Sequence, residues 1–188
     1  IDHVQIPSLR FAPFVPGQLP KLGGASIFEQ LKKHEILLHH PFQSFQPVVD
    51  FICAAARDPD VVAIKQTIYR TGTHSELMEA LVAAARAGKE VTVILELMAR
   101  FDEEANINWA DKLETAGAQV VYGVVGLKTH AKIALAIRRE DGGLKFYSHL
   151  GTGNYHLTTT RLYTDFGLLT ARQEIGAEVN GVFIHLTS

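Results

Sequence analysis

The feature that most constrains the fold is an alternation of apolar, β-rich runs with amphipathic segments across residues 61–123. Three runs read as buried strands: residues 61–69 (VVAIKQTIY), 91–97 (VTVILEL) and 118–123 (AQVVYG). The two segments between them, residues 75–88 and 102–117, have helical periodicity and each ends in a glycine. Strand, helix, strand, helix, strand predicts a right-handed parallel sheet with covering helices.

The alternation of strands and helices ends after Gly126. Residues 131–139 and 144–150 predict a hairpin, and Asp141-Gly142-Gly143 supplies its turn. After the hairpin, the sequence predicts a strand at 161–170 and a helix at 171–186. Before the parallel strands, it predicts a helix at 47–57 and a short helix capped by Ser26. The fold class is therefore α/β, with a mixed parallel and antiparallel sheet sandwiched by helices. Residues 1–34 are expected to be a lead-in from a preceding domain, and residues 35–188 the folded domain.

Composition restricts the class of partner. The chain has 188 residues, a formal net charge of −2 and no apolar run near the roughly 20 residues that span a bilayer. The acidic balance argues against nucleic acid, so any polyanion must be held by a local group of cations. One cysteine, Cys53, allows no internal disulfide, which suits a reducing cytoplasm. The start lacks both a methionine and a signal peptide, so we expect an excised piece of a longer chain.

The strongest local motif is Lys128-Thr129-His130-Ala131-Lys132, where a loop enters a strand. Side chains alternate along a strand, so His130 and Lys132 are expected to point the same way. A nucleophilic imidazole beside a fixed cation is what transfer of a phosphoryl group requires. The alternative is a histidine satisfied by a core hydrogen bond, with a solvated lysine.

The second motif, residues 149–154 (HLGTGN), ends the next strand. Its glycines let backbone N–H groups approach an anion, and Asn154 adds a donor. A tight turn that merely needs glycine is the alternative for this segment alone. On adjacent strands, however, His-x-Lys and Gly-Thr-x-Asn form a rarer combination than either part.

Two arginines follow consecutive strands. Arg70 comes after residues 61–69, and Arg100 comes after residues 91–97. Ligand sites gather beyond the carboxyl ends of parallel strands, so both guanidinium groups are expected on one rim, where they could clamp a phosphate. Solvated loop arginines are the alternative.

Weaker candidates surround these motifs. Tyr163 and Asp165 share one face of the predicted strand 161–170, and Asp165 or Glu96 is a candidate to orient the His130 ring. Residues 102–104 (DEE) are expected to cap a helix rather than bind a metal. Neither the lone Cys53 nor the adjacent pair at residues 39–40 supports a zinc site.

Taken together, the motifs resemble a known family. His-Ala-Lys with Gly-Thr-Gly-Asn is similar to the half-motif of the phospholipase D superfamily. Longer strings resemble bacterial polyphosphate kinase of the long-chain synthesising type: IKQTIYRTG, VILELMARFDEEANI, GLKTHAKI, YSHLGTGNY and TTRLYTDFGLLTA. The likeness covers roughly residues 35–185 and identifies the domain as the first catalytic half of such an enzyme.

The resemblance implies roles for single residues. His130 corresponds to the histidine that takes the terminal phosphate of ATP, and Tyr163 to a tyrosine that contacts the adenine. Arg70 and Arg100 correspond to arginines of the magnesium–phosphate site, although a guanidinium has no lone pair for Mg²⁺ and would act through phosphate. His149 corresponds to a second motif histidine with a less clear role.

The same resemblance implies partners. These are ATP or ADP, inorganic polyphosphate, a second catalytic half and a homo-oligomeric full-length enzyme in the cytoplasm, with peripheral membrane association as an alternative. One departure is Ile137, which stands where the phospholipase D half-motif has an acidic residue. A phospholipase D-like phosphodiesterase and a non-catalytic polyanion-binding domain are the rival functions.

Overall fold

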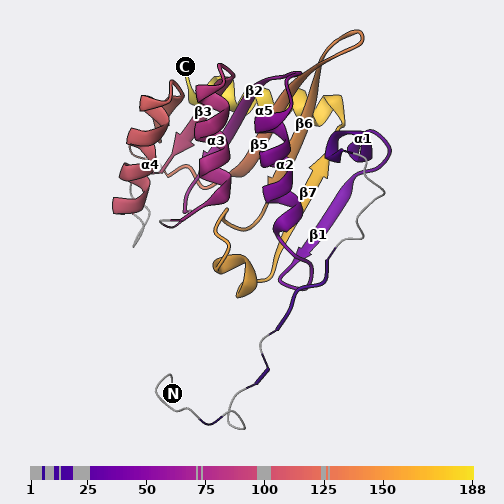
Figure 1. Cartoon of the computed structure of the whole chain (residues 1–188), viewed down its shortest axis with the longest axis vertical. Coiled ribbons are helices and arrows are strands. Elements are labelled where there is room, and N and C mark those ends of the chain that lie inside the picture. The colour runs from indigo at the N-terminus through magenta and orange to yellow at the C-terminus, as the bar shows by residue number, and fades with distance from the viewer. Residues whose placement is uncertain are drawn as a thin grey trace.

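The computed structural model describes residues 6, 11, 12, 14–18, 26–70, 72, 74–96, 103–123, 126 and 128–188. Seven strands in this part of the chain form one sheet, in the order β1-β7-β6-β5-β2-β3-β4 (Figure 1). The strands are β1 (Ile36–His40), β2 (Val61–Ile68), β3 (Glu90–Leu95), β4 (Gln119–Tyr122), β5 (Lys132–Glu140), β6 (Gly143–Gly151) and β7 (Asp165–Thr170). The helices are α1 (Ile27–Leu31), α2 (Gln46–Arg57), α3 (Glu76–Arg86), α4 (Glu103–Thr115), α5 (Gln173–Leu186) and the 3₁₀ turn η2 (Thr159–Arg161).

The sheet is mixed, as predicted. Strand β2 pairs in parallel with β3, and β3 in parallel with β4. Strand β5 lies antiparallel to both β2 and β6, so the predicted hairpin joins the parallel half to an antiparallel half. Its turn uses Gly142 and Gly143 with φ values of 94° and 120°, a backbone region that glycine adopts without steric cost. Strand β1, which pairs antiparallel with β7 at the sheet edge, was not predicted from the sequence.

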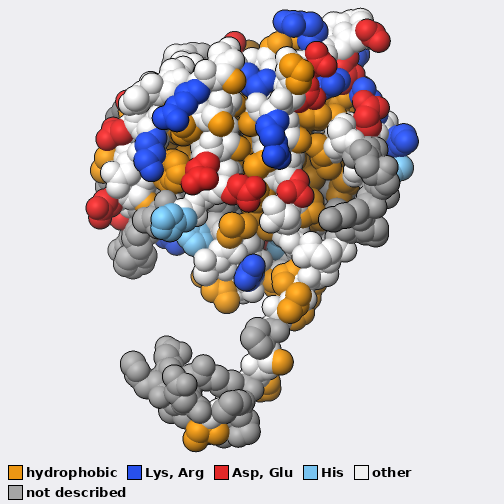
Figure 2. Space-filling view, viewed as in Figure 1, with side chains coloured by type: hydrophobic (Ala, Val, Ile, Leu, Met, Phe, Trp, Pro, Cys, Tyr) orange, Lys and Arg blue, Asp and Glu red, His pale blue; other side chains and the backbone are white. Residues whose placement is uncertain are grey.

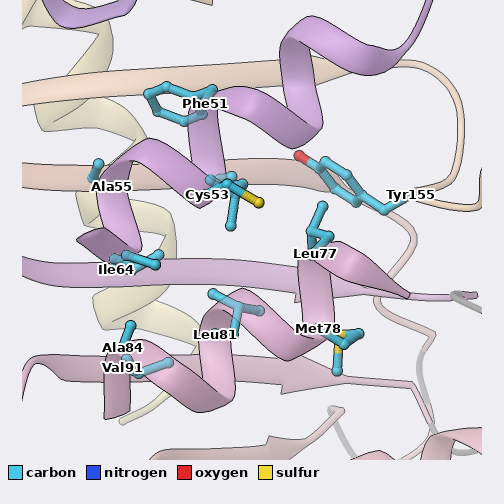
Figure 3. Close-up of a cluster of buried hydrophobic side chains, with 14 of the residues drawn as sticks. Phe51, Cys53, Ala55, Ile64, Leu77, Met78, Leu81, Ala84, Val91 and Tyr155 are labelled. Atoms are coloured by element: carbon cyan, nitrogen blue, oxygen red, sulfur yellow. The ribbon is translucent and has the colours of Figure 1, made fainter. Parts of the chain in front are cut away.

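Helices cover both faces of the sheet. Helices α2, α3 and α4 lie on one face and α5 on the other (Figure 1). The larger core lies under α2 and α3, where Phe51, Ile64 and Leu81 are fully buried (Figure 3). A smaller core joins Phe183 of α5 to Leu135 of β5. Burying such side chains contributes about 1.5–3 kcal/mol each, which explains the strength of the apolar pattern in the sequence.

Helix boundaries follow the expected signals. The Ser75 hydroxyl accepts the Met78 N–H at 3.3 Å and caps α3. The helix ends just before Gly88, whose φ is 84°. Two residues of the expected lead-in, Phe28 and Leu31, are buried in the larger core.

An ion cluster lies at the sheet end where β5 finishes. Arg138 donates to Asp58 at 2.9 Å and to Glu140 at 3.0 Å. Tyr147 also donates to Glu140, at 2.6 Å. These bonds tie the loop that follows α2 to the β5–β6 hairpin.

The surface is mixed in charge. Acidic and basic side chains are interspersed over the face that α2, α3 and α4 cover (Figure 2). Among the residues that the structure describes, none of the helices combines the length and apolar character needed to cross a membrane.

Helix α5 approaches β6 closely at Gly176. A Cβ there would lie 2.1 Å from the Phe146 Cβ, so Gly176→Ala forces the helix away from the sheet. We expect a loss of about 1–3 kcal/mol in the free energy of unfolding, measured by urea denaturation, despite the higher helix propensity of alanine.

The matched control is Gly181→Ala in the same helix, where a Cβ meets nothing within 4 Å. This change is expected to be neutral or to stabilise by up to about 1 kcal/mol. Equal midpoints for the two variants would contradict the close packing at Gly176.

Candidate active site

The predicted site residues that the structure describes lie toward one end of the sheet. Strands β2 and β3 finish at this end, and β5 begins there because it runs antiparallel to β2. Strand β6 ends here at Gly151, and β7 begins at Asp165. We call this the site end of the sheet. The reversal of direction brings the loop before β5 to the carboxyl ends of β2 and β3.

Tyr69 is the contact point for three predicted site residues. The His130 ring stands edge-on to the Tyr69 ring, with centroids 5.1 Å apart. The Lys132 Nζ lies 5.3 Å and the Arg70 Cζ 5.9 Å from the centre of the same ring. An aromatic face attracts such cations, so Tyr69 holds two positive groups near one imidazole. The structure thus brings His130, Lys132 and Arg70 together.

His130 and Lys132 differ in their surroundings. Strand β5 begins at Lys132, so His130 lies in the loop before it, and strand alternation does not account for their proximity. His130 is exposed, whereas Lys132 is buried, and its Nζ donates to the carbonyl of His130. Burial lowers the pKa of Lys132, partly offset by the carboxylate of Asp165. A cation in this position is screened less by water than a surface lysine.

A hydrogen bond to the buried Glu96 fixes the loop that carries His130. The Thr129 N–H donates to the buried carboxylate of Glu96 at 3.1 Å. The fully buried Asn106 of α4 donates to the carbonyl of Glu96 at 2.9 Å and to that of Tyr69 at 3.1 Å. Glu96, a candidate to orient His130, therefore holds the backbone beside it, and Asn106 links the ends of β2 and β3.

The glycine loop, residues 151–154, is pinned to β7. The Thr152 hydroxyl donates to Asp165 at 2.7 Å and accepts the Phe166 N–H at 2.9 Å. A Cβ at Gly153 would lie 2.4 Å from the Asp165 carboxylate, so this position requires glycine. Asp165, the other candidate to orient His130, contacts this loop instead. Asn154 is half-buried, and its Oδ1 has no hydrogen-bond partner among the described residues.

His149 is enclosed in the interior. It is 1% exposed, and its Nδ1 lies 2.7 Å from the Tyr155 hydroxyl. Burial, with a smaller contribution from His40, lowers the pKa of His149 to about 3. The ring is therefore neutral near pH 7 and offers no exposed face to a substrate.

Tyr163 does not lie on a strand. The predicted strand 161–170 begins only at Asp165, and Tyr163 follows the 3₁₀ turn η2 with 64% of its surface exposed. This part of the strand prediction is wrong for two reasons. Threonine hydroxyls bond locally, as Thr159 does to the carbonyl of His156 at 3.0 Å. The partner strand β1 also ends opposite Asp165 and is followed by Pro41, which has no N–H to donate.

Sequence reasoning missed two residues of this site. Tyr69 was included in a strand with no role of its own, although its place beside Arg70 was a usable signal. Asn106 was treated as one polar residue of an amphipathic helix, and only its complete burial reveals its role. The prediction for Arg100 falls outside the described residues, as does that for Asp102.

The fold first defines a class of protein. The phospholipase D family member Nuc from Salmonella typhimurium has a similar structure, with a TM-score of 0.62 over 81% of this chain and 92% of that chain. Sequence identity is 15%, so this likeness shows the fold alone. The domain therefore has the α/β fold of a phospholipase D family member, as expected.

The family follows from closer matches. The sequence model of polyphosphate kinase C-terminal domain 1 matches residues 26–188. A polyphosphate kinase from Neisseria meningitidis serogroup A is 62% identical over 187 residues, 99% of this chain. The crystal structure of polyphosphate kinase from Porphyromonas gingivalis matches 85% of this chain, with 38% identity and a TM-score of 0.75. The chain belongs to the polyphosphate kinase family.

The match covers only part of each relative. The chain spans about a quarter of the length of the curated relatives it matches, 27% of the Neisseria protein. It also covers 27% of the Porphyromonas chain. The matches thus show the family of this chain, whereas the activity of a complete enzyme is a separate inference.

Asn106→Ala removes both bonds that link the ends of β2 and β3 and leaves two carbonyls without this donor. We expect a loss of about 2 kcal/mol in the free energy of unfolding, measured by urea denaturation. Asn108→Ala, at an exposed position of the same helix, is the control and should change stability by less than about 0.5 kcal/mol. Equal stability of the two variants would refute the linking role.

His149 predicts a dependence of stability on pH. Its pKa is about 3 in the folded state against an ordinary value of 6.5, so the unfolded chain binds more protons between these values. The stabilisation is complete above pH 6.5 and is lost as pH falls toward 3, at up to about 1.4 kcal/mol per pH unit. The difference in unfolding free energy between the wild type and His149→Phe should therefore shrink on acidification. A constant difference from pH 7 to pH 4 would contradict this assignment.

Proposed function

We propose that this segment forms one half of the active site of an ATP:polyphosphate phosphotransferase, in which His130 carries the phosphoryl group as a phosphohistidine. One observation carries the proposal: the exposed imidazole of His130 lies beside two cations, Lys132 and Arg70, arranged around Tyr69. A nucleophile next to positive charge meets the two requirements of phosphoryl transfer. The family to which the chain belongs supports the choice of ATP and polyphosphate as substrates.

The proposed reaction has two displacements. A lone pair of the neutral His130 ring attacks the γ-phosphorus of ATP, the new P–N bond forms, and the P–O bond to ADP breaks with its electrons leaving on ADP. A terminal oxygen of polyphosphate then attacks the same phosphorus, and the P–N bond breaks to restore the imidazole. Lys132 and Arg70 stabilise the charge on the transferring group's oxygens in both steps. Both steps are reversible, so the same site would also make ATP.

Magnesium fits this site only through phosphate. Within the described residues, no group of three or more His, Cys, Asp or Glu side chains could hold a metal ion. The nearby side chains Arg70 and Lys132 are cations, which bind phosphate oxygens and cannot ligate Mg²⁺. Bound to the phosphates, Mg²⁺ would neutralise part of their charge. We propose that Arg70, together with Arg100, holds the phosphates of such a complex.

Other roles in this proposal come from the family likeness. Tyr163 is exposed and available to contact the adenine of ATP, and Asn154, in the glycine loop, has an amide oxygen without a hydrogen-bond partner among the described residues. A second catalytic half, and a homo-oligomer of the complete enzyme, are proposed partners. Because the chain covers 27% of its relatives, ample sequence remains in them for such a half.

A phosphodiesterase of the phospholipase D type is the second candidate, and the similar fold of Nuc favours it. Against it, Ile137 takes the position of the acidic residue in that half-motif. Ile137 lies in the smaller core against α5, 9% exposed, where a carboxylate would be desolvated. The kinase is therefore preferred.

The test uses His130→Ala in the complete enzyme, with γ-labelled ATP. We expect the acid-labile, base-stable label and polyphosphate synthesis both to disappear, because no other exposed imidazole contacts Tyr69 among the described residues. His34→Ala is the control, since His34 is exposed and lies before β1 at the far end of the sheet.

Labelled phosphate that persists on the His130→Ala variant would refute the assignment of His130 as the nucleophile. Release of an alcohol from a phosphodiester without ATP would favour the phosphodiesterase. Salt-dependent polyphosphate binding without any phosphohistidine would favour a non-catalytic domain.

A further inference from the structure

Two buried histidines converge beneath the glycine loop. His149 lies on β6 and His40 on β1, and they are 1% and 2% exposed. Strand β7 runs between them, and Gly167 lies at the point where their rings meet. A Cβ at Gly167 would lie 2.9 Å from the Nε2 of His149 and 3.3 Å from that of His40. Neither Nε2 has a hydrogen-bond partner among the described residues.

The outer nitrogens of the two rings fix where the protons lie. His40 Nδ1 is 2.9 Å from the carbonyl of Gln43, which can only accept, so this nitrogen carries the proton. His40 Nε2 therefore presents a lone pair. Tyr155 is buried, and among the described residues its hydroxyl is placed against one acceptor, His149 Nδ1. A buried hydroxyl left without an acceptor is costly, so Tyr155 donates and His149 carries its proton on Nε2.

We propose that Tyr155, His149 and His40 form a hydrogen-bonded relay with a single direction, which positions the glycine loop for catalysis. The order of donation is Tyr155 O–H to His149 Nδ1, His149 Nε2–H through a bridging water to His40 Nε2, and His40 Nδ1–H to the Gln43 carbonyl. Each of the three side chains donates one hydrogen bond to the next group in this order. The inference rests on the proposed function and makes His149 a positioning residue instead of a second phosphoryl carrier.

The relay holds both ends of the loop. Tyr155 follows Asn154 directly, and His149 lies two residues before Gly151. A Cβ at Gly151 would lie 3.0 Å from the His149 Cε1, so the ring fills the space beneath this glycine. Gly151 in turn pairs with Lys132 across β5 and β6. A shift of the His149 ring therefore moves the backbone beside the buried cation of the site.

Burial separates the two motif histidines by role. His130 is exposed and can meet a phosphate, whereas His149 is enclosed by Tyr155, His40 and the backbone of the glycines. A neutral ring in that place supports the loop without adding a charge that would compete for the anion. The sequence alone could not make this distinction, because both histidines lie in motifs of the same kind.

The first test is the tautomer of His149. In the chain of residues 1–188 with ¹⁵N-labelled histidine, we expect the spectrum to show His149 protonated on Nε2 and His40 on Nδ1, with His149→Gln and His40→Gln used for assignment. His149 protonated on Nδ1 would overturn the relay. This measurement needs no ATP and no active enzyme, so it is independent of the proposed reaction.

The second test uses Tyr155→Phe in the complete enzyme. Loss of one buried donor should slow kcat about tenfold and leave the KM for ATP nearly unchanged, with label still on His130. Tyr122→Phe is the control, because that hydroxyl binds Glu114 on an exposed surface at the other edge of the sheet, and it should leave kcat unchanged.

Two results would overturn the positioning role: phosphate found on His149, or an unaltered kcat in a Tyr155→Phe variant that has lost the Nε2 tautomer. A relay confirmed by the tautomer in an enzyme whose His130 is never labelled would instead refute the proposed function and leave the hydrogen bonding intact. If Tyr155→Phe does not fold, the wild-type tautomer measurement still decides.

Discussion

The candidate site depends on the reversal of strand direction at β5. Strands β2 and β3 run in parallel and deliver Tyr69 and Glu96 to one end of the sheet. Strand β5 pairs with β2 in the opposite sense, so its first residue, Lys132, and the preceding His130 arrive at the same end. A fourth parallel strand in the position of β5 would have placed the His130 loop about 25 Å away, since a strand of this length rises about 3.3 Å per residue. The mixed sheet is thus the structural condition for the site.

Neighbouring polar groups at the site differ in their electrostatic properties because they are buried to different extents. Lys132 is enclosed, so its charge acts on a nearby anion with little screening. His149 is enclosed and neutral, so it serves as a support. His130 alone among these three is exposed and able to form a covalent bond with an incoming phosphate. Under the proposed function, position relative to the core, more than residue type, separates the nucleophile, the cation and the support.

Most of the fold could be predicted from periodicity, because its central elements are either continuously apolar or amphipathic over several turns. Strand β1 was missed because five residues at a sheet edge, with only Leu38 and His40 buried, carry too weak a pattern. The start of β7 was misplaced because threonine side chains favour a local turn that no apolar pattern reveals. His130 and Lys132 were paired on the expectation of strand alternation, although His130 lies in the loop before β5. For Tyr69 the sequence offered only its place beside Arg70 as a signal. The burial of His149 also depends on β1 and β7, which come from distant parts of the chain.

The ion cluster around Arg138 lies at the end of the sheet remote from His130, and this separation has an evolutionary consequence. Arg138, Asp58 and Glu140 hold the hairpin and the α2 loop without touching any residue of the site. Thermal adaptation can therefore proceed at that end through changes in ion pairing, while the site end keeps its constrained glycines and imidazoles.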